Sequence, residues 1–166
     1  MRELDALAGF EKSGHYFFNP PIGRGYDDGL VSAIAILDLL DRSPGSSLST
    51  IYRSLTRTWL SPTMSAACPD EEKYAVADAV TARFRQAMDA GERIGAHTIV
   101  DLITVNGVRV VTDDGTWGLV RASSNKPELV VVVESPVSAA RMREMFEIVD
   151  GFMREHAVVG DYNQTL

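Results

Sequence analysis

The dipeptide Asn106-Gly107 constrains the fold of this chain more than any other feature of its sequence. Asn-Gly supplies the positive φ angles of a type I′ turn, which joins two antiparallel strands with only two residues between them. Branched apolar residues flank the dipeptide, so we expect strands at about 99–105 and 108–112. The sheet of the C-terminal half is therefore predicted to be antiparallel.

Two more strands and two helices are expected around this hairpin. A turn at 113–115 leads into a strand that ends at Arg121, and a polar loop then leads into a strand at 129–133. Apolar residues every four positions predict a helix over about 70–90, with the acidic run at its start read as capping rather than metal binding. Ser135-Pro136 is expected to start a last helix, which runs to about His156. The order of helix, four strands and helix is typical of an α+β domain with two helices on one face of the sheet.

A smaller module is expected in the N-terminal third. It contains a strand candidate at 16–18, a helix that Asp27 or Asp28 caps and that runs to about Asp41, and a second helix that Ser46 or Ser47 starts. The proline-containing segment 58–69 is interpreted as a linker, which places one domain at 1–60 and another at 61–166. The tail 157–166 has no clear periodicity and gives no prediction of order.

Charge and composition exclude several classes of protein. The net charge of −7 argues against binding to nucleic acid or to an anionic membrane surface, where a basic patch would be expected. Cys68 is the single cysteine, so no disulfide can form within the chain. No apolar run reaches the length of a membrane span and no leader peptide is recognisable, so we expect a cytoplasmic protein.

The segment 121–127 has the chemistry of an anion site. Small hydroxyl and amide residues lie between a guanidinium at Arg121 and an ammonium at Lys126. Together they could offer a dianion paired N–H donors, several O–H donors and close approach of the backbone. Serine and asparagine are also ordinary turn residues, so the loop alone is equally well explained as a polar connection.

A second segment favours the anion site. Gly9-Phe10-Glu11-Lys12-Ser13-Gly14-His15 stands near the start of the chain, and Gly25-Tyr26-Asp27-Asp28-Gly29 follows it. With these motifs in this order, the chain resembles the C-terminal part of the phosphohexomutases, the phosphoglucomutase/phosphomannomutase family. The resemblance extends roughly from Gly9 to His156.

The resemblance implies a role for each motif. In that family a Gly-Gly-Glu-x-Ser-Gly-His segment of the third domain contacts the sugar hydroxyls, and an Arg-x-Ser-Asn-Thr-x-Pro-like loop of the fourth holds the substrate's phosphate. The sugar ligands implied here are Glu11, Ser13 and His15, and the phosphate ligands are Arg121, Ser123, Ser124 and Asn125, with added charge from Lys126. The implied fold is a four-stranded sheet packed by two helices, similar to half of a TATA-box-binding-protein-like saddle, after a strand-helix-helix remnant of an α/β domain.

The sequence also departs from the family pattern. Phe10 replaces the second glycine of the sugar motif, and Ser124-Asn125-Lys126 replaces the usual Asn-Thr-x run. Neither the catalytic phosphoserine motif nor the Asp-x-Asp-x-Asp magnesium motif of the family occurs in these 166 residues. We therefore expect no catalytic residue and no metal ligand in this chain, and we expect Mg²⁺ to belong to the full-length enzyme.

The function implied by the resemblance is substrate recognition in a phosphohexomutase. Such an isomerase of carbohydrate metabolism moves a phosphoryl group between C1 and C6 of a hexose, so the expected partners are a hexose phosphate and the N-terminal domains of the same enzyme. One alternative is a stand-alone module that binds a sugar phosphate without turning it over. Another is a structural interaction domain with no ligand. The sugar motif does not distinguish glucose from mannose.

Overall fold

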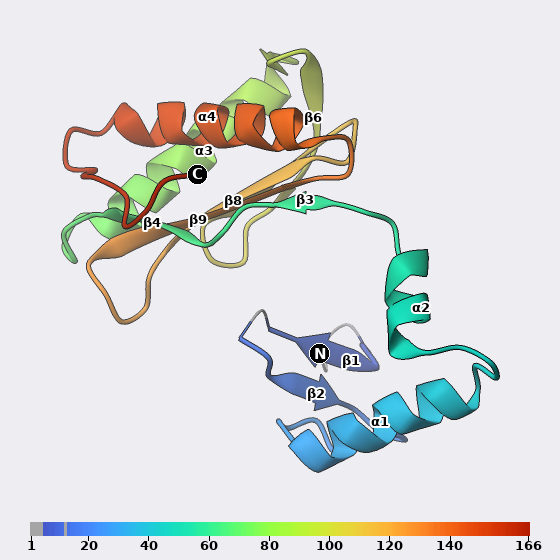
Figure 1. Ribbon diagram of the computed structural model, residues 1–166. Coiled ribbons are helices and arrows are strands. Elements are labelled where there is room, and N and C mark those ends of the chain that lie inside the picture. Colours follow the sequence, from blue (N-terminus) through green and yellow to red (C-terminus); the bar gives the residue numbers. More distant parts are fainter. Residues whose placement is uncertain (1–4, 12) are drawn as a thin grey trace. The chain divides into compact units, whose positions relative to one another are not determined.

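The computed structural model describes residues 5–11 and 13–166, which fold as two compact units (Figure 1). The first unit is Met1–Leu55 and the second is Thr56–Leu166. No helix in the described part of the chain is long and apolar enough to cross a membrane.

The first unit contains one hairpin and two helices. Its elements are β1 (Ala8–Phe10), β2 (Tyr16–Phe18), α1 (Gly29–Asp41) and α2 (Leu48–Ser54). The strands pair antiparallel, with Gly9 opposite Phe17, and β1 is an element that the sequence did not predict. Asp28 caps α1, because its carboxylate accepts the N–H groups of Leu30 and Val31. Ser47 caps α2 in the same way, as expected.

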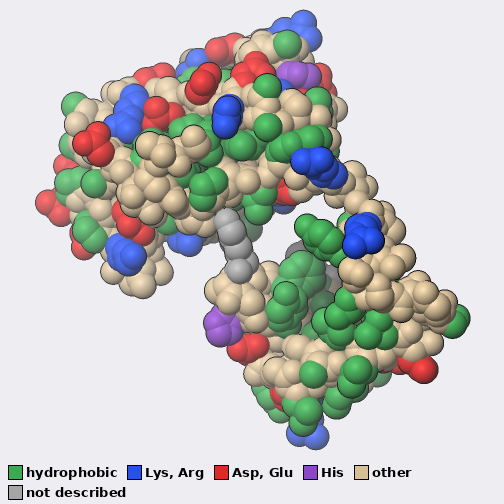
Figure 2. All heavy atoms as spheres, in the orientation of Figure 1, with side chains coloured by type: hydrophobic (Ala, Val, Ile, Leu, Met, Phe, Trp, Pro, Cys, Tyr) green, Lys and Arg blue, Asp and Glu red, His purple; other side chains and the backbone are tan. Residues whose placement is uncertain are grey.

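The residues that the structure describes in the first unit form no buried core. None of its described residues is fully buried, and α1 carries large apolar side chains around most of its circumference (Figure 2). The most exposed of these on α1 are Leu30, Ile34, Ile36, Leu37 and Leu39, at 44–72%. A helix that is apolar all round is normally buried on several sides, so α1 has surface suited to further packing partners.

The second unit contains a seven-stranded sheet with two helices on one face (Figure 1). Its strands are β3 (Trp59–Leu60), β4 (Met64–Ala67), β5 (Arg93–Ile94), β6 (His97–Ile103), β7 (Val108–Thr112), β8 (Trp117–Ala122) and β9 (Glu128–Ser135). The order is β3-β9-β8-β7-β6-β5, and β4 also pairs with β9. The long strands β6 to β9 form the predicted antiparallel meander, so the α+β fold class is confirmed.

Helices α3 (Lys73–Asp89) and α4 (Ala139–Arg154) cover the same face of this sheet. Phe84 of α3 is fully buried and packs against Phe152 of α4, with ring centroids 4.7 Å apart. A Cβ atom at Gly118 of β8 would lie 2.8 Å from a methyl group of Val149, so glycine lets α4 approach the sheet closely. The alternating buried residues of the four strands complete the core.

The segment expected to be a linker is instead part of the sheet. Strands β3 and β4 both pair antiparallel with β9, and Met64 and Ala66 are almost completely buried. Pro62 lies between the two strands, where no ladder hydrogen bond is needed from its nitrogen. The interpretation of 58–69 as a linker is therefore wrong. It gave more weight to the two prolines of the segment than to its short alternating pattern, which indicates a strand.

Two predicted helix starts are also corrected. Ser135 is the last residue of β9, and the side chain that caps α4 belongs to Ser138, which accepts the N–H of Arg141. At α3 no carboxylate caps the helix, and Asp70 forms an ion pair with Lys73 instead. The cap of α4 is thus three positions later than the sequence indicated, and α3 begins without any side-chain cap.

The C-terminal tail 157–166 is ordered against β4. Tyr162 forms a β-bridge with Ala66, and the N–H of Asn163 donates to the carbonyl of Ser65 at 2.9 Å. The side-chain oxygen of Asn163 accepts the N–H of Ser65 at 2.8 Å. These hydrogen bonds cover the edge of β4 that does not face β9.

Candidate functional site

The anion loop joins β8 to β9 and spans 123–127. The N–H of Ser123 donates to the carbonyl of Glu128, and the N–H of Glu128 donates to the carbonyl of Lys126. The first residue of the loop is buried, whereas 124–127 are exposed. The loop is thus closed by backbone hydrogen bonds at its base and presents its polar side chains to solvent.

Arg121 lies at the end of β8 on the sheet face that the helices leave open. Its neighbours Val120 and Ala122 are buried under the helices, so the alternation of a strand directs Arg121 to the opposite face. The guanidinium donates to the carbonyl of Ala122 at 3.2 Å. No carboxylate of the residues that the structure describes lies within ion-pair distance of it. Arg121 is therefore available to bind an anion.

The Asn106-Gly107 turn supports the backbone at Arg121. A Cβ atom at Gly107 would collide with the carbonyl of Val120 and would lie 2.8 Å from the Cα atom of Arg121. Gly107 also has φ +75°, which a side chain disfavours. Glycine is required here because the hairpin turn packs directly on the strand that carries the guanidinium.

The loop side chains bond to one another as well. The hydroxyl of Ser123 donates to the side-chain oxygen of Asn125 at 3.2 Å. Ser124 is exposed next to this pair. The structure thus gathers Arg121, Ser123, Ser124 and Asn125 at one end of the sheet, as required if they bind one phosphate.

The sugar motif forms the turn between β1 and β2 in the first unit. The N–H of Glu11 donates to the carbonyl of His15, and Gly14 adopts φ +90° in the turn. The hydroxyl of Ser13 donates to the carboxylate of Glu11 at 3.0 Å. All three predicted sugar ligands are exposed on this turn, and Lys12 lies outside the described residues.

Asp27 is a site residue that the sequence analysis assigned only to helix capping. Its carboxylate accepts a hydrogen bond from Nδ1 of His15 at 2.6 Å and another from the N–H of Tyr16 at 3.2 Å. Asp28 is the helix cap, which leaves its neighbour free for the histidine. The sequence signal for these two separate roles was the pair of adjacent aspartates that follows the His15 segment.

The His15–Asp27 contact shifts both pKa values. The hydrogen bond to the carboxylate raises the pKa of His15, and the same hydrogen bond lowers the pKa of Asp27. It also fixes the imidazole orientation, since Nδ1 is occupied and Nε2 is left for another partner. Any ligand that His15 binds is therefore expected to contact Nε2.

We expect Asp27→Asn to lower the pKa of His15 toward its ordinary value. The amide removes the negative charge that stabilises the imidazolium, while it keeps a hydrogen-bonding group of the same shape. NMR titration of the His15 ring protons in both proteins measures the change. His156 provides an internal control, and equal His15 titration curves would contradict the assignment.

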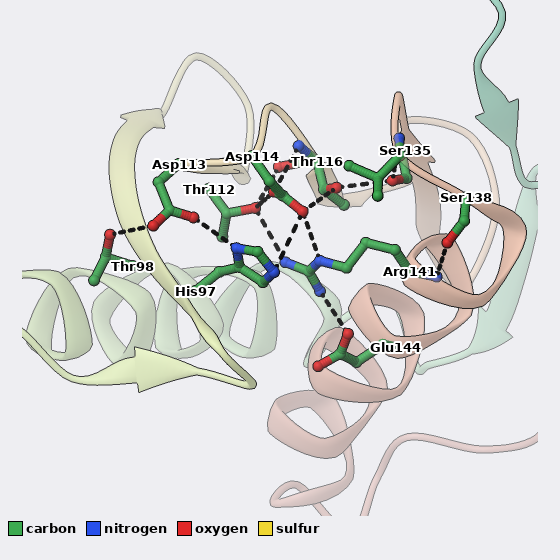
Figure 3. Close-up of polar contacts among 11 residues, drawn as sticks. His97, Thr98, Thr112, Asp113, Asp114, Thr116, Ser135, Ser138, Arg141 and Glu144 are labelled. Carbon is green, nitrogen blue, oxygen red and sulfur yellow. Dashed lines mark hydrogen bonds and ion pairs between the residues drawn. The ribbon is translucent and has the colours of Figure 1, made fainter.

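One group in the described residues has the spacing of a metal site: His97, Asp113 and Asp114 (Figure 3). The guanidinium of Arg141 lies 2.8 Å from Asp114, which also accepts hydrogen bonds from Thr112 and Thr116. The carboxylate of Asp114 is thus already paired with a buried cation and with two hydroxyl donors. This group therefore does not fit Mg²⁺, and we assign it to the stability of the fold.

Comparison with known proteins finds a family match for each of the two units. The C-terminal domain of phosphoglucomutase/phosphomannomutase matches residues 64–151, and the alpha/beta/alpha domain III of the same enzymes matches residues 1–59. The phosphomannomutase/phosphoglucomutase of Pseudomonas putida is 31% identical over 148 residues, which cover 88% of this chain and 29% of that protein. The phosphoglucomutase of Neisseria meningitidis is 32% identical over 152 residues, covering 90% and 30%.

A crystal structure has the same fold. It is a phosphoglucomutase/phosphomannomutase family protein from Burkholderia thailandensis, with a TM-score of 0.72, 22% identity, and coverage of 98% of this chain and 31% of that one. The two units thus correspond to domain III and the C-terminal domain of the phosphoglucomutase/phosphomannomutase family models. The chain belongs to the phosphoglucomutase/phosphomannomutase family, and it spans about 30% of the length of these relatives.

Proposed function

We propose that this chain is the substrate-recognition part of a phosphohexomutase that interconverts hexose 1-phosphate and hexose 6-phosphate. The observation that carries the proposal is the guanidinium of Arg121, which has no ion pair with any described carboxylate, beside a closed loop of hydroxyl and amide groups. The net charge of −7 disfavours anions at the protein surface in general, so an anion is attracted only by local groups such as these. Ser123, Ser124 and Asn125 would complete the phosphate site.

The proposal divides the work between the two motifs. Arg121 and its loop would hold the phosphate that does not react, while Glu11, Ser13 and His15 bind the sugar hydroxyls. A mutase must bind its intermediate in two orientations, so one phosphate site has to serve both. Asp27 supports this scheme because it orients His15.

The chemistry itself is proposed to lie in other domains of the same enzyme. We infer that these domains supply the phosphoserine, and that Mg²⁺, which neutralises the moving phosphoryl group, is bound there. Residues 1–60 would complete the third domain and 61–166 would form the fourth, in the cytoplasm. The family matches, which end at 59 and begin again at 64, support this division.

The test is titration of the 166-residue chain with glucose 6-phosphate and with inorganic phosphate, followed by NMR amide shifts. We expect both ligands to shift the amide signals of the loop. Glu11→Gln should weaken the binding of glucose 6-phosphate only, because inorganic phosphate has no sugar hydroxyls. We expect no conversion of glucose 1-phosphate by this chain. Conversion above a mock preparation, or unchanged loop amides, would contradict the proposal. Binding without turnover in the complete protein would favour the sensing module instead.

A further inference from the structure

We propose that Lys73 is a positioning residue for the anion loop and places a positive charge beneath it. This inference rests on the proposed function of the loop in binding phosphate. Lys73 is the first residue of α3, far from the loop in sequence. Its Nζ atom nevertheless donates to the carbonyl of Lys126 at 2.9 Å.

The position of Lys73 is unfavourable for stability alone. Its side chain is only 5% exposed, and an ammonium group loses much of its hydration at such a site. The N-terminus of α3 is also the positive end of the helix dipole, where a cation is repelled. A residue that is costly on both counts is expected where function requires it.

The charge of Lys73 is incompletely neutralised. Asp70 accepts from Nζ at 2.6 Å, but the Asp70 side chain is 67% exposed, so water screens the carboxylate more than the ammonium. Nζ also lies over the ring of Tyr74, 5.3 Å from its centroid, in a cation–π contact that attracts the ammonium without cancelling its charge. A partly desolvated positive charge acts over a longer distance than a surface one, and the exposed side of the loop is where it would attract a dianion.

Lys73 also holds the backbone of the loop. The carbonyl of Lys126 accepts from Lys73 and from the N–H of Glu128, and the carbonyl of Pro127 accepts from the N–H of Cys68. Two consecutive carbonyl oxygens are thus engaged with donors of the protein. Carbonyl oxygens held in this way are not free to turn toward a bound anion and repel it.

The experiment compares Lys73→Met, Asp70→Asn and Arg83→Met in the full 166-residue chain, with inorganic phosphate as the probe. Methionine keeps the length of the lysine side chain and removes its charge. Arg83 is the matched control, because it lies on the same helix, ten residues from Lys73, and is ion-paired to Glu92. NMR titration gives the affinity, and thermal unfolding gives the stability.

We expect Lys73→Met to weaken phosphate binding roughly threefold to tenfold without a fall in melting temperature, because an apolar side chain suits a buried site at least as well. Asp70→Asn should bind phosphate at least as tightly as the parent, since the ammonium loses its counter-charge. Arg83→Met should bind like the parent.

Two results would overturn the inference while leaving the proposed function intact: phosphate binding by Lys73→Met equal to the parent's, or equal weakening by Lys73→Met and Arg83→Met. A melting temperature lowered by Lys73→Met with unchanged affinity would assign Lys73 to stability only. If the parent chain itself does not bind phosphate, the proposed function of the loop is wrong and the inference fails with it.

Discussion

Arg121→Ala should lower the affinity of the chain for inorganic phosphate roughly tenfold to a hundredfold. Loss of charge-assisted hydrogen bonds from a guanidinium costs on the order of 1.5–3 kcal/mol. The effect should be near the upper end, because no carboxylate in the described part of the chain competes for this side chain and all of its charge is available to the anion.

Arg143→Ala is the control for this experiment. Arg143 is an exposed arginine of α4, the helix that covers the opposite face of the sheet, so the variant has the same net charge as Arg121→Ala. Amide shifts in a phosphate titration give both affinities. If the two variants bind alike, the effect is one of overall charge and Arg121 is not the phosphate ligand.

Asp114→Ala should destabilise the second unit by about 3 kcal/mol, because it leaves a buried guanidinium without its main partner. Arg141 is 6% exposed and donates to Asp114 at 2.8 Å, while Glu144 accepts from it more weakly at 3.2 Å (Figure 3). The Asp114 carboxylate also accepts hydrogen bonds from the hydroxyl of Thr112 and from the N–H of Thr116. This one side chain therefore connects the β7–β8 turn to α4.

Urea unfolding followed by tryptophan fluorescence measures this change in the second unit alone, since both tryptophans, Trp59 and Trp117, belong to it. Asp113→Ala is the matched control in the same turn. Its carboxylate is 41% exposed, so we expect its contact with His97 to contribute much less to stability than the buried pair does. Equal losses for the two variants would show that the buried ion pair is not what stabilises the turn.

The loss at Asp114 should also depend on pH. Burial alone would raise the pKa of Asp114, but hydrogen bonds from Thr112 and Arg141 outweigh it and hold the pKa well below its usual range. A carboxylate with a lowered pKa contributes its stabilisation above the pKa of the unfolded chain, about 4, and loses it as the pH falls further. The difference between parent and Asp114→Ala should therefore shrink in acid.

The fold of the second unit was predictable because its signals are local. Asn106-Gly107 indicates the hairpin, but the expected two-residue type I′ turn is wrong: β6 ends at Ile103, β7 begins at Val108, and Gly107 but not Asn106 has a positive φ. The four-residue repeat of Val76, Val80 and Phe84 marks the buried face of α3, whereas Met88, which continues the repeat, is 39% exposed. Strands β3 and β4 were missed because their pairing with β9 is distant in sequence. A strand of two residues, such as β3, is too short to show a periodicity. It forms because the edge of its partner β9 is available for pairing.

The motif residues of the candidate site could be proposed from the sequence, whereas the residues that contact and support them could not. A polar loop between strands identifies Arg121 and its neighbours, but the roles of Asp27 and Lys73 depend on contacts across 12 and 53 positions of sequence. Asp27 was assigned to the nearest helix start, which is the local explanation for a charged residue there, and Lys73 was not singled out from the sequence at all. Contacts distant in sequence decide the position of both side chains.

The C-terminal tail 157–166, which pairs with β4, limits how copies of this protein can associate. Its hydrogen bonds to Ser65 and Ala67 occupy the backbone groups that would otherwise accept a strand from another molecule. A chain shortened before Gly160 would present β4 as an open edge, with the loop-supporting Cys68 directly after it. Loss of the last few residues would thus convert a self-contained sheet into a template for intermolecular strand addition, and the anion loop would lie beside the new junction.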